Sequence, residues 1–338
     1  MLGIGGSSQS REMLRPADLL PYCRPDTRRA LFEVAITVIP LVLLWALMWL
    51  SLDVGYWLTL LLAIPAGGLL VRLFIIQHDC GHGAFFRHRA ANAWMGRVLG
   101  VLTLTPFDYW KRNHAIHHST SSNLDKRGIG DIDLLTVEEY RAKPWWGRLL
   151  YRCYRSPPVM FVIGPAWMFL LQHRLPFHQW RDGWRPWIST MATNAAIVLT
   201  VVGMIWLVGV GPFVMVHLPI MLLAASMGVW LFYVQHQFAD VYWAHTGTWS
   251  HQEAALAGSS YYDLPGLLRW FSGNIGIHHI HHLNSRIPYY RLPKVLAAHP
   301  ELKAVRRLTL WDSLKSVRLS LWCERHKKLV SFKAARAK

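Results

Sequence analysis

Cysteine is scarce in this sequence, and so is any sign of an N-terminal export signal. Only 4 of the 338 residues are cysteine, and none of them forms a Cys-x-x-Cys pair. This excludes a disulfide framework and a zinc knuckle, and the free thiols suit a reducing compartment. The first residues lack the charged start, short apolar core and small-residue cleavage site of a signal peptide. Membrane insertion would therefore use internal apolar segments.

Acidic residues are also few, which gives the chain an unusual balance of charge and hydrophobicity. Asp and Glu number 19 against 36 Lys and Arg, so the formal net charge is +17, although 53% of the residues are hydrophobic. A basic chain of this kind can bind nucleic acid, but its long apolar runs argue against that function. The composition instead predicts lipid-facing apolar segments joined by basic loops on one side of a bilayer.

Four apolar stretches approach the roughly 20 residues that a helix needs to cross the hydrocarbon core. Only a few residues separate the first from the second and the third from the fourth, so each pair is expected to form a helical hairpin. The prediction is an all-α integral membrane protein with four transmembrane helices. The expected spans are about 31–52, 56–76, 188–208 and 213–234.

The distribution of Lys and Arg predicts the orientation of these spans. Neither short link contains a basic residue, whereas residues 77–156 contain 12 and residues 236–338 contain 15. Because positive charge favours the cytoplasmic side, both termini and the central loop are expected in the cytoplasm. The expected parts are an N-terminal cytosolic segment 1–30, a membrane domain 31–300 and a basic cytosolic tail 301–338.

Two features of the apolar regions need their own interpretation. The run 157–172 is short and contains three prolines, so we expect it to lie at the interface or against the protein. Arg72 falls within the second apolar run, where a buried charge is costly. We expect the second helix to leave the bilayer near this residue, so that the guanidinium reaches the interface.

Histidine is abundant and clustered in three short motifs. "HDCGH" contains His78 and His82, "HAIHH" contains His114, His117 and His118, and "HHIHH" contains His278, His281 and His282. Residues at i, i+3 and i+4 share one face of a helix, so each motif can direct several imidazoles at one point. His279 is expected to point elsewhere. Unpaired imidazoles crowded in this way repel one another when protonated, and bound metal removes that cost.

The number of nitrogen donors indicates two metal ions. A zinc hydrolase needs only three protein ligands, which would leave whole motifs unused, whereas imidazole also suits iron. A metal transporter or sensor would place its ligands within the spans, but nearly all of these histidines lie outside them. Further candidates are His236 as a ligand, Asn274 as a direct or water-mediated ligand, and Asp79 and Asp240 as acceptors that orient the rings.

The motifs and their neighbouring residues resemble those of the membrane fatty acid desaturases, most of all the bacterial acyl-lipid desaturases. The stretches that carry the resemblance are "FIIQHDCGHGAFF", "WKRNHAIHHSTSSNLDKRGIGDIDLLTVEEY", "VWLFYVQHQFADVYW" and "GNIGIHHIHHLNSRIPYYRL". They extend from about residue 35 to 300. The resemblance implies a cytosolic helical cap that carries a di-iron site, an enzyme of the bacterial inner membrane, and O2 as co-substrate.

The resemblance also implies the residues and partners of the reaction. Members of the family remove two hydrogens from adjacent methylenes of an acyl chain and leave a cis double bond. They receive electrons from ferredoxin or a cytochrome b5-like carrier, and since this sequence has no HPGG haem motif, the donor is expected to be a separate protein. Related histidine-motif hydroxylases and ketolases remain the alternative. The implied iron ligands are His78, His82, His114, His117, His118, His236, His278, His281 and His282.

Overall fold

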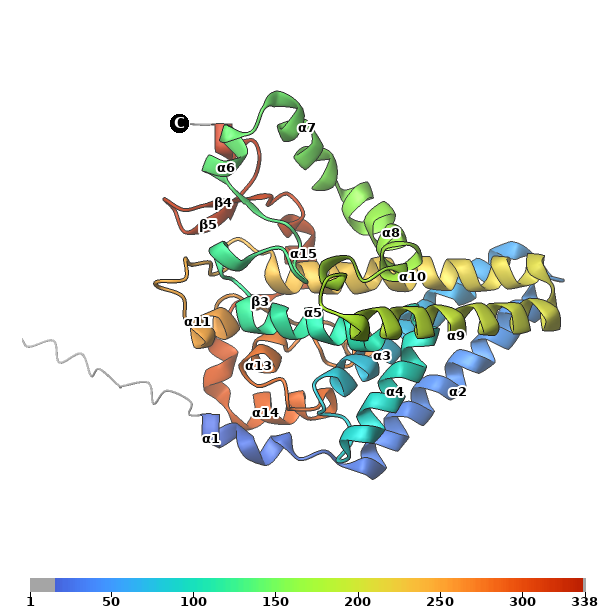
Figure 1. Ribbon diagram of the computed structural model, residues 1–338. Helices are drawn as coiled ribbons and strands as arrows, with labels where there is room; N and C mark the ends of the chain where they lie inside the picture. The colour runs from blue at the N-terminus through green and yellow to red at the C-terminus, as the bar shows by residue number, and fades with distance from the viewer. Residues whose placement is uncertain (1–15, 337–338) are drawn as a thin grey trace, which may run out of the picture.

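The computed structural model describes residues 16–336, and most of them are helical (Figure 1). The four longest helices coincide with the expected spans, and each is long and apolar enough to cross a membrane. Two of them extend beyond the apolar run and carry a histidine motif residue at or near their last turn. These helices are α2 (Thr27–Ser51), α3 (Tyr56–Gly81), α9 (Trp184–Val208) and α10 (Val210–His236).

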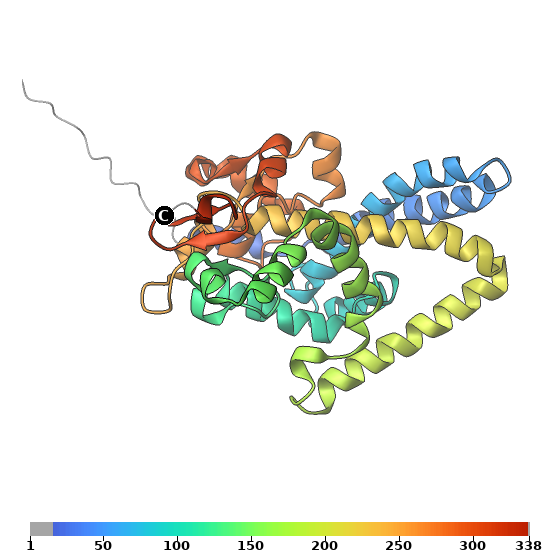
Figure 2. The same ribbon diagram turned by 90° about the horizontal axis from the view of Figure 1, so that it is seen from above.

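The long helices are arranged around α3, which is the most buried of the four. Helix α3 packs along α2 on one side and along α10 on the other. Helices α9 and α10 meet at Gly209 and then diverge (Figure 2). Gly209 has φ 86°, a left-handed conformation that glycine adopts without a steric penalty. Both connections lie at one end of the molecule, and the shorter elements gather at the other end (Figure 1).

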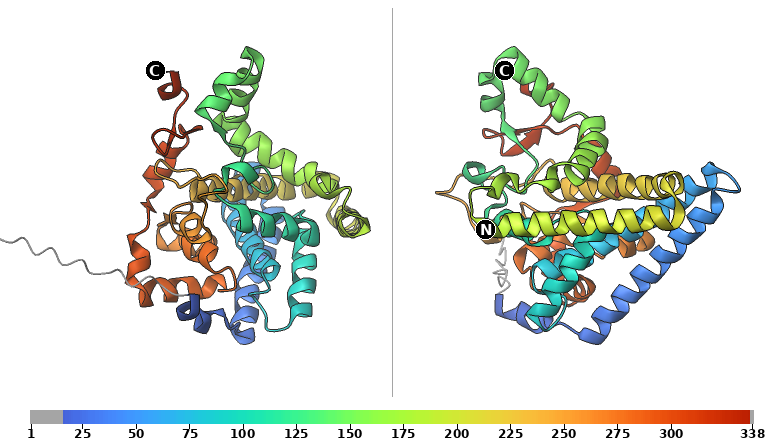
Figure 3. Two further views of the ribbon diagram at one scale, coloured as in Figure 1. Left: turned by 60° about the vertical axis from the view of Figure 1, so that its left-hand side comes forward. Right: turned by 45° about the vertical axis from the view of Figure 1, so that its right-hand side comes forward.

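Shorter helices build this second end of the molecule (Figure 3). Most of them are only one to three turns long and are joined by loops. Helices this short are not stable in isolation, so tertiary packing must hold them in place. They are α1 (Pro16–Leu19), α4 (Arg89–Leu102), α5 (Phe107–Thr120), α6 (Val137–Ala142), α7 (Trp145–Tyr154), α8 (Gly164–Leu170), α11 (His251–Leu256), α12 (Gly266–Phe271), α13 (His278–Leu283), α14 (Leu292–Ala298) and α15 (Leu310–Ser316). Single turns are η1 (Leu20–Cys23), η2 (Leu124–Lys126), η3 (Val159–Ile163), η4 (Gln172–Arg174), η5 (Phe177–Gln179), η6 (Tyr289–Arg291), η7 (Pro300–Ala304) and η8 (Ala334–Arg336).

Short strands form two small sheets, so the expected all-α fold is only partly right. In the first sheet β1 (Leu135–Thr136) pairs in parallel with β4 (Leu321–Cys323), which pairs antiparallel with β5 (Lys328–Val330). In the second, β2 (Tyr261–Tyr262) pairs in parallel with β3 (Arg307–Leu308). Through these strands, residues 301–336 pack onto the rest of the chain.

The run 157–172 was expected either at the membrane interface or against the protein, and the structure places it against the protein. Its first part is the π-helical turn η3, and α8 follows directly; both pack against α10. Phe161 makes edge contacts with Trp230 and Tyr233 of α10. His173, which directly follows the run, is buried.

The position expected for Arg72 is wrong. Its side chain is only 3% exposed and forms an ion pair with Glu33 of α2, which is equally buried. The guanidinium also lies over the ring of Trp270, 4.3 Å from its centroid. The Arg72 charge is therefore neutralised by the buried Glu33 carboxylate and not by water at the membrane interface.

Candidate metal centre

The box histidines, defined as the nine predicted ligands, come from four helices that meet at one end of the bundle. His78 lies in the last turn of α3, and His82 caps its C-terminus. Helix α5 carries three of the box histidines and α13 carries another three, while His236 is the last residue of α10. Segments far apart in the sequence therefore deliver their imidazoles to the same place.

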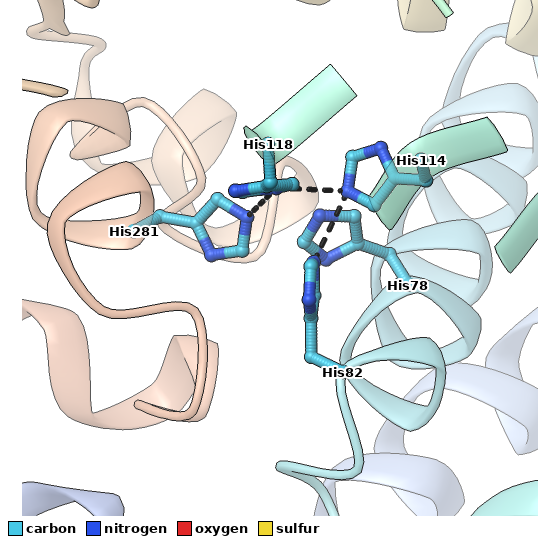
Figure 4. Close-up of side chains that lie close together, drawn as sticks. All are labelled: His78, His82, His114, His118 and His281. Carbon is cyan, nitrogen blue, oxygen red and sulfur yellow. Dashed lines mark hydrogen bonds between the residues drawn. The ribbon is translucent and has the colours of Figure 1, made fainter. Parts of the chain in front are cut away.

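The structure brings the box histidines together in two groups, each of which could hold a metal ion. Within each group, ligand atoms of all members lie within 4.8 Å of one another. Figure 4 shows the first group, in which rings from α3, α5 and α13 point toward a common space. We call them the five-histidine group, His78, His82, His114, His118 and His281, and the four-histidine group, His117, His236, His278 and His282.

Helical periodicity divides the α5 and α13 motifs between the two groups. On α5, His114 and His118 belong to the five-histidine group, whereas His117 belongs to the other. Residues i and i+4 project in nearly the same direction, while i+3 projects about 100° away from i+4 because an α-helix has 3.6 residues per turn. On α13 the motif divides the other way, with His281 alone in the five-histidine group. Each of these helices thus contributes to both sites.

The two groups are adjacent, and their Nε2 atoms face inward. The Nε2 atom of His114 lies 3.1 Å from those of both His82 and His118. His118 in turn stacks on His282 of the other group, with ring centroids 4.2 Å apart. A neutral imidazole has one N–H, so His114 cannot satisfy two facing nitrogens at once. A cation between the nitrogens satisfies them all.

The four-histidine group contains a buried ring nitrogen that is suited to bind a metal ion. His117 Nε2 is buried and has no hydrogen-bond partner within the described residues. The other ring nitrogen, Nδ1, lies 2.5 Å from the Asp131 carboxylate. That acceptor fixes the proton on Nδ1, so Nε2 presents its lone pair to the group. The donor set therefore fits a metal ion.

Burial keeps the imidazoles neutral and ready to bind metal. Desolvation lowers the pKa of His82, His114 and His118 well below the usual value, and the neighbouring imidazoles lower it further. Burial likewise lowers the pKa of His281 and His282. At neutral pH these rings are therefore uncharged, and each has one nitrogen lone pair that can bind a metal ion.

The two groups differ in their access to solvent. All members of the four-histidine group are buried, whereas His82, His114 and His118 of the other group are partly exposed. A cavity of about 330 Å³ lies beside His82, and Arg89 and Lys111 contribute to its wall. A second, small cavity lies beside His236, and its wall combines the apolar side chains of Ile132, Phe232 and Trp243 with polar ones. The polar side chains are those of Ser121, Asp131 and Gln237.

Acceptors and rings around the groups hold the imidazoles in place. Asp79 Oδ1 lies 3.1 Å from His78 Nδ1, as expected for an orienting carboxylate. The Gly258 carbonyl lies 3.3 Å from His236 Nδ1, and Trp110 stacks on His114. Sequence reasoning missed Asp131, although it lies in "GIGDIDLL", one of the stretches that carry the family resemblance.

Two further residues, His279 and Asp240, lie outside the groups. His279 is buried but belongs to neither group, in agreement with the predicted direction of its side chain. Asp240 does not orient a ring, contrary to expectation, because its side chain is 63% exposed and pairs with Arg306. Asn274 adopts a left-handed backbone, φ 57°, in the loop before α13.

Comparison with known proteins agrees with this site. The family model for fatty acid desaturases matches residues 55–313, a range that contains all of the box histidines. The chain belongs to the fatty acid desaturase family. A member from Bacillus subtilis, named a fatty acid desaturase, is 46% identical over 93% of this chain and 88% of its own length.

More distant family members have more specific names. An sn-1 oleoyl-lipid 12-desaturase of Synechocystis sp. is 28% identical over 71% of this chain and 67% of its own length. An sn-1 acyl-lipid omega-3 desaturase (ferredoxin) of the same organism is 26% identical over 69% of this chain and 64% of its own length. Family membership and the four apolar helices together indicate an integral membrane oxidoreductase.

Proposed function

We propose that this desaturase-family chain introduces a cis double bond into a lipid-linked acyl chain, with two iron ions held by the box histidines. When bound, the irons supply the oxidising chemistry, which activates O2 against an unactivated C–H bond. Two hydrogens leave adjacent methylenes, and with two protons and two electrons they reduce one O2 to two waters. The protein binds the chain, positions one methylene pair and excludes water.

The observation that carries this proposal is the pair of adjacent histidine groups. Together they offer nine imidazole nitrogen donors, and neither includes a cysteine or a carboxylate within the described residues. A single zinc site takes four ligands, so one zinc ion would leave about half of these donors without a role. Two ions of a metal that suits imidazole account for all of them, and iron provides the O2 chemistry that desaturation needs.

We further propose that the acyl chain passes beside the four-histidine group. Ile132, Phe232 and Trp243 lie in the wall of the small cavity beside His236 and offer apolar surface to an alkyl chain, next to polar lining residues. A saturated chain offers no polar handle in its middle, so apolar contacts along its length must define which methylenes reach the metals. The named activities of the two Synechocystis relatives, on oleoyl-lipid and acyl-lipid, support a lipid-linked substrate.

The proposed location is the bacterial inner membrane, with both helix pairs as hairpins and the histidine end in the cytoplasm. The connections at 52–55 and 209 contain no Lys or Arg, whereas the segments that build the histidine end contain most of them. Positive charge is retained on the cytoplasmic side. This orientation also gives the metal centre access to soluble reductant.

Electrons would come from a separate ferredoxin or cytochrome b5-like protein, which we propose approaches the five-histidine group. His82 lies on the wall of the larger cavity, so this side offers a short route to the site. Arg89 and Lys111 line the same cavity, and no acidic residue does within the described chain. An acidic face on the donor would be attracted to this position. The name of one relative includes ferredoxin.

The test is expression in a bacterial host that cannot make unsaturated fatty acids, with mapping of double bonds by mass spectrometry. We expect a cis-unsaturated product and two irons in the purified chain. Replacement of His118 or His281 with Ala should abolish the product while the protein still inserts into the membrane. His251→Ala, at an exposed position on α11, is the matched control and should retain activity. A hydroxylated or keto product would instead assign the chain to a related histidine-motif enzyme.

A further inference from the structure

The α13 motif is flanked on both sides by contacts to one buried ion pair. Trp270, at the end of α12, precedes the motif, and Tyr289, in η6, follows it. Both residues contact the Glu33–Arg72 pair, which links α2 to α3. The segment that supplies His278, His281 and His282 is thus attached to α2 and α3 on both sides of the motif.

Arg72 makes the contact on the N-terminal side of the motif. Its Nη1 donates to the Trp270 carbonyl, and its guanidinium lies over the Trp270 ring. Its Nε donates to Thr37 Oγ1 of α2 at 3.1 Å, and its Nη2 pairs with Glu33. The planar guanidinium can satisfy these partners in several directions at once, which the single ammonium of a lysine could not do with the same geometry.

Tyr289 makes the contact on the C-terminal side and links the ion pair to the metal centre. Its hydroxyl donates to Glu33 Oε2 at 2.9 Å, and its backbone N–H donates to Asp79 Oδ2 at 2.7 Å. The other oxygen of Asp79 lies 3.1 Å from His78 Nδ1. One residue therefore touches both the buried pair and the carboxylate that orients a member of the five-histidine group.

Between the two contacts, the backbone approaches α3 closely. Gly273 has φ 56°, and a Cβ atom at this position would lie 2.8 Å from the Ile75 side chain. Any larger residue would push the loop, and α13 after it, away from α3. The separation between α3 and α13 is thus defined by contacts on each side and by direct packing in the middle.

Stability alone does not account for this ion pair. Burial of two charges costs solvation that their attraction repays only in part, and replacement by apolar residues is often neutral or stabilising. Charged groups within spanning helices are similarly costly. An apolar cluster would pack the same space, but it would not fix the directions of Trp270 and Tyr289.

We propose that Glu33, Arg72 and Tyr289 are positioning residues for the metal centre. They set the distance between α13 and α3 and so bring His281 to the site that His78 and His82 occupy. This inference rests on the proposed function only in requiring that the two groups bind metal. None of the three residues takes part directly in the desaturation reaction under this proposal.

The test compares metal binding by the metal-free, detergent-solubilised chain, with Co²⁺ as the probe. The main variant is the apolar triple substitution Glu33→Leu, Arg72→Met and Tyr289→Phe. We expect the variant to insert and to unfold at the wild-type temperature or above it, because neither charge of the Glu33–Arg72 pair remains buried. Its affinity for Co²⁺ should fall about 10- to 100-fold, as is typical when residues that support ligands are lost. The visible absorption of bound Co²⁺ should also change.

A second variant keeps the result interpretable if the triple variant fails to fold. Tyr289→Phe leaves the ion pair in place and removes only the contact with Glu33, so a smaller change in Co²⁺ affinity and absorption is expected. Tyr290→Phe is its matched control, because the Tyr290 hydroxyl accepts from Asp26 N and does not reach Glu33. Wild-type Co²⁺ affinity and absorption in a folded triple variant, or in Tyr289→Phe, would overturn the proposal. The two proposals can fail separately. If the wild-type chain bound two Co²⁺ but its iron form gave no double bond, the proposed function would be wrong, whereas the comparison of Co²⁺ binding between the wild type and the variants would still test the positioning role.

Discussion

Single hydrogen-bond acceptors decide which ring nitrogen of a box histidine faces the metal. Asp131 and Asp79 accept from Nδ1 of His117 and His78, one in each group. With the proton held on Nδ1, Nε2 is free to bind, and the ring cannot rotate without loss of that bond. Because both carboxylates are buried, or nearly so, the choice of tautomer does not depend on solvent.

We predict that Asp131→Asn weakens the four-histidine site selectively. The amide can offer its NH₂ to Nδ1 and so favour the wrong tautomer of His117, which should reduce metal affinity about 10- to 100-fold. Iron analysis at limiting metal should then show close to one ion per chain in place of two. Asp125→Asn is the control, since Asp125 bonds the exposed His245 and touches no box histidine. Equal iron content in Asp131→Asn and wild type would contradict the role given to Asp131.

At the scale of helices and strands, the sequence predicts the parts that local patterns encode. Apolar runs predict α2, α3, α9 and α10 to within a few residues, and the histidine motifs predict that rings from distant segments gather together. The expectation that each motif points at one place holds for His78 and His82 but is wrong for the α5 and α13 motifs. The division of the α5 motif between two groups could not be predicted, because it depends on where the partner helices lie. The same holds for Glu33 as the partner of Arg72, since the two lie on different helices.

The short strands were missed for a related reason. A strand of two or three residues is too short to show an alternation of apolar and polar side chains. Strand β1 forms only because β4, which lies near the C-terminal end of the sequence, pairs with it. This pairing has a consequence for the site, because β1 follows Asp131 by only a few residues. The C-terminal segment thus helps to hold the loop that orients His117.

We predict that Trp322→Ala weakens this support. Trp322 lies in β4 opposite Thr136 and is only 1% exposed, so its removal should cost about 3–5 kcal/mol of local packing free energy. The loop that carries Asp131 should loosen, with faster amide exchange at residues 131–136 and a loss of iron mainly from the four-histidine group. Trp311→Ala is the control, because Trp311 is 74% exposed on α15. Unchanged amide exchange in the loop of Trp322→Ala would refute the link between β4 and the site.

At the scale of the whole molecule, the two histidine groups face different surroundings. The four-histidine group is buried and lies beside a small cavity with both polar and apolar lining residues, while the five-histidine group is partly exposed beside a cavity lined by Arg89 and Lys111. An O2-activating centre needs both properties, since the acyl chain must react away from water and the electrons must come from a soluble protein. If both groups bind iron as proposed, two adjacent sites would provide both properties in one protein.

We predict that Lys111→Glu slows electron delivery without damage to the metal centre. With an acidic ferredoxin as donor, the rate of desaturation should fall about tenfold at low salt, and the fall should shrink as ionic strength rises. With dithionite as reductant, the single-turnover yield and the iron content should match those of wild type. Lys294→Glu, at an exposed position on α14, is the control for net charge and should have little effect. A similar loss of rate with dithionite would mean that the basic cavity binds substrate and not the donor, because the chemical reductant bypasses the docking step.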